Sequence, residues 1–250
     1  MNTQNAPTFV TARHVAMASA IGAAALLAGC ASTQATHPQD PFEGYNRAMT
    51  SFNDGVDQAV LRPVATTYQS VTPQPVRTGV TNFFGNIGDL WSMVNHGLQG
   101  NGEKTYTHMV RFTTNTVLGF GGILDLASEM QLPRDKQDFG LTLARWGVQP
   151  GPYLVLPLLG PSTVRDTVAL PVDFQGNVLG GLHPVSHRNA LTALRLVDTR
   201  TNLLGVTDSL DAAALDRYSL MRDFYLKQRD PAGRTAQEDE NAGRVESYDD

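Results

Sequence analysis

The chain has 250 residues, of which 41% are hydrophobic and 17% charged, and its formal net charge at pH 7 is -5. This length suits a single domain with a sizeable core. The acidic balance and the presence of only three lysines exclude a typical nucleic-acid-binding protein, which needs basic patches to neutralise phosphates. The charged fraction is below the roughly one quarter that is usual in soluble domains, so part of the surface is predicted to contact lipid or another protein.

The N-terminal residues predict a lipoprotein signal peptide. Arg13 and His14 precede an apolar run, residues 15–27, that has the length of a secretory h-region and is too short to span a bilayer. Residues 27–30 read LAGC, the pattern that lipoprotein signal peptidase cleaves, and Cys30 is the only cysteine of the chain. A domain that relied on disulfides would carry an even set of cysteines, so Cys30 is interpreted as a lipidation site.

These features predict a division of the chain into four parts. Residues 1–29 are the signal peptide, residues 30–39 a polar lipidated tether, residues 40–229 a folded domain and residues 230–250 a disordered acidic tail. Two or three acyl chains anchor a protein stably. Aspartate after the cysteine is the main signal for retention at the inner membrane, and Ala31 follows here. The expected location is therefore the periplasmic side of the outer membrane.

Apolar residues at helical spacing predict amphipathic helices through most of the domain. The first covers residues 45–60, has Phe52 on its apolar face and should end before Pro63. Further helices are expected over residues 64–71, 76–84, 90–98 and 106–117. Near the end of the domain, a helix should stop at Gly205, and the last helix should start at Asp208 and bury residues up to Tyr225.

Two segments between the helices stand out. Gly119, Gly121 and Gly122 interrupt an apolar run, which predicts a flexible loop that could act as a gate or, as the alternative, a tight turn between helices. Residues 146–164 carry no charge but contain four prolines, which rule out a regular spanning helix. This segment is interpreted either as a buried loop over the core or as an irregular segment that dips into the membrane interface. No strand pattern is evident.

Reactive groups do not converge on a recognisable catalytic motif. Ser162 lacks the glycine-rich elbow of a serine hydrolase. His183 and His187 have the spacing of zinc ligands on a helix, but Pro184 lies between them and no glutamate follows His183. The glycine cluster lacks the lysine that follows in a phosphate-binding loop. No catalytic residue, metal site or cofactor is therefore predicted.

A group of carboxylates occupies the middle of the chain. These are Asp125, Glu129, Asp135 and Asp138, which could be imagined as a paired-carboxylate site. They alternate with basic residues, so a solvated charged connection between helices is the preferred interpretation.

The domain carries a series of specific strings. They are DPFEGYNR at residues 40–47, LRPVA at 61–65, PQPVR at 73–77, NFFGN at 82–86, NTVLGFGG at 115–122 and GPYLVLP at 151–157. Together they resemble the VacJ/MlaA family of outer-membrane lipoproteins. Ala144 and Gln149 depart from this resemblance, since the family pattern has glycines there.

The resemblance implies an all-α fold, a ring-like bundle of amphipathic helices in the membrane interface with a flexible glycine-rich loop. It implies that the protein removes misplaced phospholipids from the outer leaflet through an amphipathic channel and passes them to a periplasmic carrier protein. Trimeric porins are the implied partners. Phe52, Gly119, Gly121 and Gly122 are then the candidate channel or gating residues.

Two other classes of function predict different features. A structural lipoprotein that braces a porin would need no lipid-binding cavity. A lipid-cleaving esterase would need a reactive serine or histidine pair. A passive channel for phospholipid needs only a polar side for the headgroup and an apolar side for the tails.

Overall fold

The computed structural model describes residues 37–230. The predicted signal peptide, the lipidation site Cys30, most of the tether and the tail from residue 231 onward lie outside the described residues. The elements in chain order are α2 (Glu43–Val56), the π-helix η2 (Asp57–Leu61), α3 (Arg62–Val71), α4 (Gln74–Leu98), α5 (Gly102–Val117), α6 (Leu126–Glu129), α7 (Phe139–Arg145), β1 (Tyr153–Leu156), β2 (Gly160–Thr163), α8 (Val164–Gly176), the 3-10 helix η3 (Val178–Gly181), α9 (Val185–Ala213) and α10 (Arg217–Gln228).

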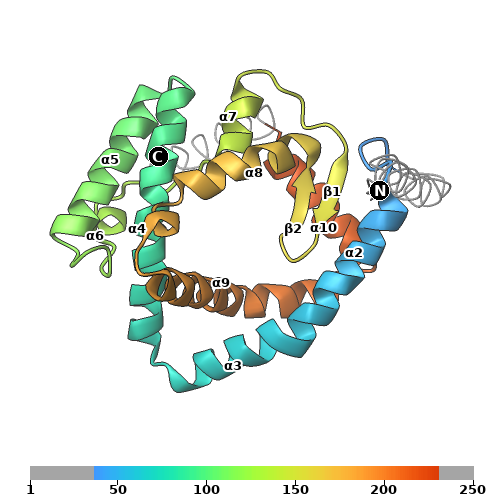
Figure 1. Ribbon diagram of the computed structural model, residues 1–250, viewed down its shortest axis with the longest axis horizontal. Helices are drawn as coiled ribbons and strands as arrows, with labels where there is room; N and C mark the ends of the chain where they lie inside the picture. Colours follow the sequence, from blue (N-terminus) through green and yellow to red (C-terminus); the bar gives the residue numbers. More distant parts are fainter. Residues whose placement is uncertain (1–36, 231–250) are drawn as a thin grey trace, which may run out of the picture.

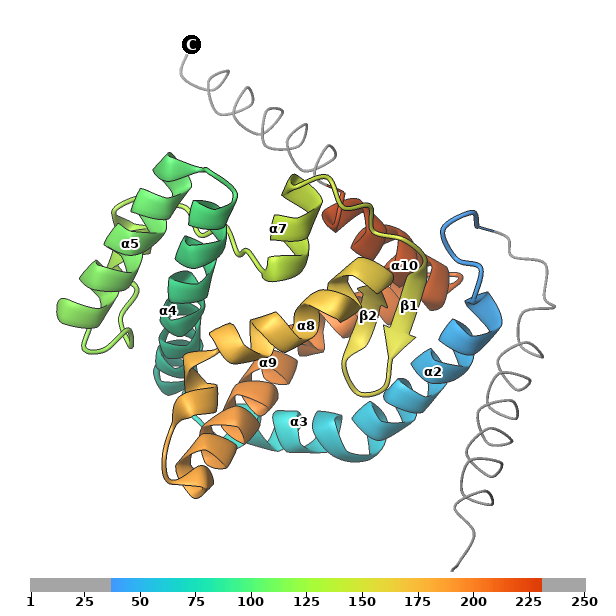
Figure 2. The ribbon, with the colours of Figure 1, turned by 45° about the horizontal axis from the view of Figure 1, so that its top comes forward.

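The helices form a ring. In Figure 1, α2 and α3 make one side, α4 the next, and α8, α9 and the β1–β2 hairpin surround an open centre. In the tilted view of Figure 2, α5 stands outside the ring beside α4. The expectation of an all-α ring-like bundle is confirmed, with one small hairpin added.

Polar side chains fix where five of the helices begin. Asn101, Asp125, Asp138, Thr163 and Asp216 each accept a hydrogen bond from a backbone N–H in the first turn of the helix that follows. Such caps satisfy N–H groups that have no partner within the helix. The last helix therefore begins at its cap Asp216, and the predicted start at Asp208 is wrong.

Residues that usually break helices are tolerated here. Pro63 lies in the first turn of α3, directly after the π-helix η2, and helical backbone continues from α2 through η2 into α3. The two helices expected over residues 76–84 and 90–98 are one helix, because α4 (Gln74–Leu98) runs through residues 85–89 without a break. Gly205 does not end a helix either, since α9 continues through it to Ala213.

The proline-rich segment contains a β-hairpin that the sequence pattern did not predict. Tyr153 pairs with Thr163 and Leu156 with Gly160 in antiparallel register. Tyr153 and Val155 are buried, with Tyr218 of α10 and the partly buried Met49 of α2 packed in the same cluster. β1 is thus part of the core, and the interpretation of the whole segment as irregular is wrong.

Two asparagines of α2 complete the hairpin. Asn46 accepts a hydrogen bond from the Val155 N–H (2.8 Å) and donates one to the Tyr153 carbonyl (3.1 Å). Asn53 repeats the arrangement two turns later, donating to the Leu156 carbonyl at 2.9 Å. A helix therefore satisfies the strand edge that would otherwise lack partners.

Candidate functional site

The centre of the ring holds a cavity of about 760 Å³. Its walls come from α4, α8, α9, the β1–β2 hairpin, the end of α10 and the connection at residues 134–138. These elements are far apart in the sequence, and Figure 1 shows how the ring brings them around one opening. The cavity exists only because the ring closes.

The cavity wall has apolar and charged parts. Its large apolar side chains are Phe84, Ile87, Trp91, Leu156, Leu159, Leu170, Phe174 and Leu203. Its charged side chains are Arg134, Lys136, Arg195, Arg229, Asp138, Asp166, Asp173 and Asp198. One space therefore offers contacts for both hydrocarbon and an ionic group, the combination that an amphipathic ligand requires.

Two glycines on α4 keep the cavity open on that side. Gly85 and Gly88 lie one turn apart and both line the cavity. A Cβ at Gly88 would meet nothing within 4 Å, so any side chain there would project into free space. A Cβ at Gly85 would lie 2.5 Å from Nη1 of Arg134, so the missing side chain lets this arginine cross the helix toward Asp89.

The carboxylates in the wall are hydrogen-bonded. Asp138 and Asp166 both bind Arg229, at 2.7 and 2.9 Å. Asp173 accepts hydrogen bonds from Nε1 of Trp91 and from the backbone N–H of Phe139, both at 2.8 Å. Burial raises the pKa of Asp173 above its ordinary value, against the effect of these two donors.

Asp198 and Tyr225 complete the polar wall. The Asp198 carboxylate accepts hydrogen bonds from the hydroxyl of Thr81 (2.9 Å) and the amide of Asn202 (3.3 Å). Burial raises the pKa of Asp198. The Tyr225 hydroxyl donates to Asp166 at 3.0 Å, and burial raises its pKa to about 12, so it stays protonated at neutral pH.

A buried ionic cluster lies behind α4 and joins it to α5 and α6. Arg111 is 0% exposed and binds Asp89 (3.3 Å) and Asp125 (3.0 Å). Arg134 reaches the same two carboxylates, at 3.0 and 3.4 Å. His108 contacts Asp89 at 3.2 Å. Buried charges need such pairing, so this cluster fixes the position of α4 as a wall of the cavity.

The cluster corrects the interpretation of the acidic residues at 125–138 as a solvated connection. Asp125 is paired with arginines and caps α6, and Asp138 caps α7 while binding Arg229. Asp135 binds Lys104 at 2.9 Å. Only Glu129 lies on the exposed surface as expected. Within residues 37–230, no group of three or more His, Cys, Asp or Glu side chains is arranged to hold a metal ion.

Burial in this chain is the reverse of that in a typical soluble domain. Among residues 37–230, more polar and charged side chains than hydrophobic ones are buried, including Asn95, Arg111 and Asp166. Large apolar side chains are exposed all around the ring, for example Phe120 at 76%, Val168 at 68% and Leu158 at 67%. Extensive exposed apolar surface marks contact with a membrane or another protein. In the described part of the chain, no helix has the length and apolarity that crossing a bilayer requires.

Phe52 lies on α2 and is 52% exposed. It is absent from the cavity wall, and Met49 makes the α2 contact with the core cluster instead. Val60 and Val64 follow Phe52 at multiples of four residues and are also exposed. Contact of this face with lipid stays a prediction.

The three glycines form a hydrogen-bonded turn between α5 and α6. The N–H groups of Gly121 and Gly122 donate to the carbonyls of Thr116 (3.0 Å) and Asn115 (2.8 Å). A Cβ on Gly119 would lie 2.3 Å from the Leu124 carbonyl oxygen. None of the three lines the central cavity. This geometry fits the tight-turn alternative, and a gating role stays a prediction.

Sequence reasoning missed the residues that shape the cavity, notably Gly88, Trp91 and Arg195. One signal was present: Thr81, Gly85, Gly88 and Ser92 recur at helical spacing and place small residues on one face of α4. That face is the one turned to the cavity.

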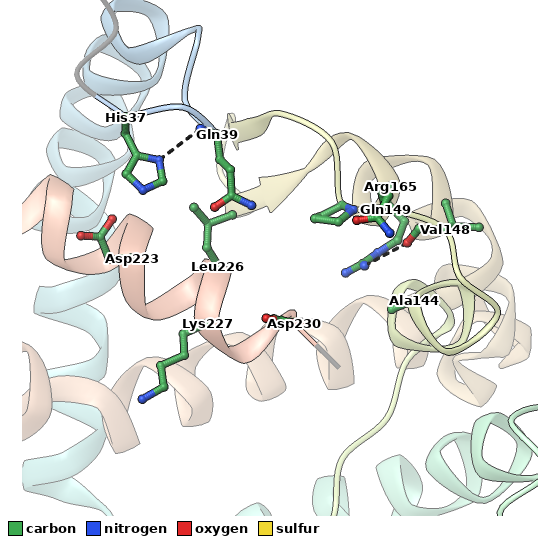
Figure 3. A pocket seen from close by; sticks show the side chains of 11 residues that line it. His37, Gln39, Ala144, Val148, Gln149, Arg165, Asp223, Leu226, Lys227 and Asp230 are labelled. Carbon is green, nitrogen blue, oxygen red and sulfur yellow. Dashed lines mark hydrogen bonds between the residues drawn. The ribbon is translucent and has the colours of Figure 1, made fainter. Parts of the chain in front are cut away.

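A second cavity of about 610 Å³ lies between α10, the segment before α2 and the connection before β1. Figure 3 shows Arg165 on its wall, bonded to the Val148 carbonyl (3.4 Å), with Lys227 and Asp223 on the opposite side. Arg165 also binds its neighbour Asp166 at 2.9 Å. Since Asp166 lines the central cavity, this pair separates the two spaces.

A ring of helices with exposed apolar flanks and a cavity that is both apolar and ionic defines a class of protein built to work at a lipid boundary. Residues 38–232 match the sequence profile of the MlaA lipoprotein family. The chain belongs to this family.

Relatives and a solved structure agree with this assignment. The Escherichia coli (strain K12) intermembrane phospholipid transport system lipoprotein MlaA is 38% identical over 219 residues, which is 82% of this chain and 83% of that protein. The Haemophilus influenzae protein of the same name is 35% identical over 162 residues, covering 62% and 65%. A chain solved to explain maintenance of bacterial outer membrane lipid asymmetry has 35% identity and a TM-score of 0.67, covering 78% of this chain and 98% of that one.

Proposed function

We propose that this protein removes mislocalised phospholipids from the outer leaflet of the outer membrane through its central cavity, without changing them chemically. The observation that carries this proposal is that the central cavity combines apolar and ionic walls in one space. A phospholipid crossing a ring of this kind keeps its charged headgroup and its tails in suitable surroundings at the same time. The names of the relatives, which place them in intermembrane phospholipid transport, support the same function.

Anchor and partners belong to the same proposal. Acyl chains on Cys30, after cleavage of residues 1–29, hold the protein on the periplasmic side of the membrane, and the exposed apolar surface of the ring seats in the membrane interface. A trimeric porin is its partner in the membrane, and a periplasmic carrier protein receives the lipid. Apolar side chains such as Phe120 and Leu158 support extensive contact with lipid or protein.

The two rival functions fit less well. A brace for a porin needs no lipid-sized cavity, whereas the ring encloses about 760 Å³. An esterase would need an activated nucleophile. Ser162 lines the cavity, but it is buried in β2, its hydroxyl is bonded to that of Thr167 (2.9 Å), and no histidine is among the described wall residues.

A plug in the cavity tests the transport proposal. Gly88→Phe places a ring where no atom lies within 4 Å of the added Cβ, inside the cavity, so the fold should tolerate it while the passage narrows. The matched control is Gly55→Phe, on the exposed part of α2, where a Cβ also meets nothing within 4 Å. Both variants replace a helical glycine outside the core.

In cells whose only copy of the protein is the Gly88→Phe variant, we expect more phospholipid on the cell surface than in cells with the parent. Enzymatic acylation of lipid A or detergent sensitivity of the cells measures this phospholipid. Gly55→Phe should behave like the parent at equal protein levels. Equal activity of both variants would contradict passage through the cavity and favour the structural rival. Intact-mass analysis of lipid incubated with the protein separates transport from cleavage.

We further propose that the glycine turn opens when lipid is admitted. Hydrogen exchange tests this without a substitution, because a turn that opens exposes its amides. The amides of Gly121 and Gly122 should then exchange faster in the presence of lipid than in its absence. Protection that is unchanged by lipid, and equal to that of the middle of α4, would leave only the tight-turn role.

A further inference from the structure

The four cationic side chains in the cavity wall differ in whether they form ion pairs with carboxylates. Arg134 is held by Asp89 and Asp125, and Arg229 by Asp138 and Asp166. Within residues 37–230, Arg195 and Lys136 have neither a hydrogen bond nor an ion pair from their side chains. The side-chain donors of Arg195 and Lys136 are therefore not used by any protein group among the described residues.

Arg195 and Lys136 differ in their access to water. Lys136 lies on the exposed connection before α7, where solvent satisfies its ammonium group. Arg195 is only partly exposed, on the face of α9 that lines the cavity. Its guanidinium N–H groups make no hydrogen bond within the described residues, so they are available to an anion that enters the cavity.

The neighbours of Arg195 indicate what kind of anion fits. Asp198, one turn away, uses its carboxylate to accept from Thr81 and Asn202. Thr199 follows Arg195 by four residues, lines the same cavity and can add a hydroxyl donor beside the guanidinium. Phe174 of α8 and Leu203 of α9 supply apolar parts of the same cavity wall.

We propose that Arg195 binds the phosphodiester of a glycerophospholipid headgroup, with Thr199 as a second donor and the acyl chains against the apolar wall. The planar guanidinium presents paired N–H donors that match two phosphate oxygens. This inference rests on the proposed transport function and assigns the group in the passage that recognises the headgroup. The phosphodiester is common to zwitterionic and anionic phospholipids, so both should bind.

Titration of the purified full chain with short-chain lipids tests the assignment. The probes are dihexanoylphosphatidylethanolamine, dihexanoylphosphatidylglycerol, dihexanoylglycerol, which lacks the phosphate, and inorganic phosphate. The variants are Arg195→Gln and Arg195→Lys. Arg188→Gln is the control, because Arg188 lies on the same helix with the same partial exposure, outside the cavity wall, and contacts Asn189.

We expect Arg195→Gln to weaken binding of both phospholipids about tenfold or more, the effect of losing a charged hydrogen bond. Arg195→Lys should lose less, and Arg188→Gln nothing. Binding of dihexanoylglycerol should be equal in all variants. Inorganic phosphate should bind far more weakly than either phospholipid, because it lacks the tails.

Three outcomes would overturn the assignment. Unchanged phospholipid binding in Arg195→Gln would refute it while leaving the transport proposal intact. An equal loss of dihexanoylglycerol binding would show that Arg195 only shapes the cavity. Absence of lipid binding by the parent itself would refute both the assignment and the proposed function. Circular dichroism of each variant establishes that the helices are retained.

Discussion

Trp91 of α4 lies directly against the backbone of Gly176 at the end of α8. A Cβ on this glycine would be 2.4 Å from the indole ring, and Nε1 of the same indole donates to Asp173 at 2.8 Å. The two contacts hold α8 against α4, where Figure 1 shows these helices meeting at one side of the ring. Ring closure, and therefore the cavity, depends on a position where only glycine fits.

Gly176→Ala should for that reason destabilise the protein, by about 1–3 kcal/mol, since overpacking forces a side chain or the backbone to move. Chemical denaturation followed by circular dichroism measures the loss. Gly205→Ala is the control: it lies inside α9 with nothing within 4 Å of an added Cβ, and should stabilise by up to about 1 kcal/mol. Equal effects of the two substitutions would contradict the tight contact with Trp91.

Asn46→Ala should also be destabilising, because it removes the hydrogen-bond partner of two backbone groups of β1. The Val155 N–H and the Tyr153 carbonyl would remain buried without a hydrogen bond, at a cost of about 1–3 kcal/mol for each group. Asn53→Ala should cost less, since the groups that it serves, on Leu156 and Leu158, are nearer the surface. Denaturation midpoints that rank the two variants in the opposite order would refute this account.

The same asparagines explain why the hairpin could not be predicted from the sequence. Its strands have four residues each, too short for a clear alternation, and the partners of β1 lie about a hundred positions earlier on a helix. The helices themselves could be predicted, because a periodic apolar face is a local property. Their ends at Pro63 and Gly205 could not, because position within the helix decides whether these residues break it.

The candidate site shows the same division between local and long-range information. The excess of apolar over charged residues predicted contact with lipid or another protein, and the family resemblance implied an amphipathic channel. The residues that shape the cavity, such as Gly88 and Arg195, come together only through ring closure. The glycine cluster near residue 120 is conspicuous in the sequence but lies outside the wall of the central cavity. A conspicuous local pattern therefore did not mark the residues that form the site.

Phe52 provides a test of how the ring is seated. If Cys30 is acylated as proposed, a cysteine substituted at position 52 is the one thiol available for an environment-sensitive dye. In vesicles of phosphatidylethanolamine and phosphatidylglycerol, the dye at position 52 should be quenched by spin-labelled lipid. The same dye on a cysteine that replaces the exposed Gln58 should be quenched less. Equal quenching at both positions would contradict a lipid-facing side of α2.

Phe52→Asp should then impair lipid removal through seating rather than folding. The phenyl ring is half exposed in the isolated chain, so its loss should change the free energy of unfolding by no more than about 0.5 kcal/mol. Removing a large aromatic from contact with hydrocarbon costs about 1.5–3 kcal/mol of membrane interaction. Gln58→Asp serves as the control for the added charge. A large drop in unfolding free energy for Phe52→Asp would instead assign the ring to the core.

The stability of the fold should decrease as the pH falls below neutral, and His96 should account for part of this change. His96 is 1% exposed and stacks on His108 with ring centroids 5.1 Å apart. Burial lowers the pKa of His96 below its ordinary value of 6.5, although Asp135 at 3.6 Å acts in the opposite direction. The folded chain thus holds this ring neutral at a pH where the unfolded chain protonates it.

The sign of the effect follows from proton binding. Between the lowered pKa of the folded state and about 6.5, the unfolded chain binds more protons, so unfolding becomes more favourable as the pH decreases. The stabilisation is fully present above pH 6.5 and is lost progressively as the pH falls toward the folded-state pKa. Thermal unfolding measured between about pH 7.5 and pH 5.5 should show a falling midpoint in the parent.

His96→Gln should reduce this slope, because glutamine does not titrate but can still donate to the Asp135 carbonyl that His96 contacts at 3.3 Å. His187→Gln is the matched control, since His187 is exposed in the first turn of α9 and its replacement should leave the slope unchanged. Asp173 and Asp198 have raised pKa values and act in the opposite direction, since they add stability as they are protonated in the more acidic range. A slope in His96→Gln that matches both the parent and His187→Gln would show that protonation of His96 does not limit stability in acid.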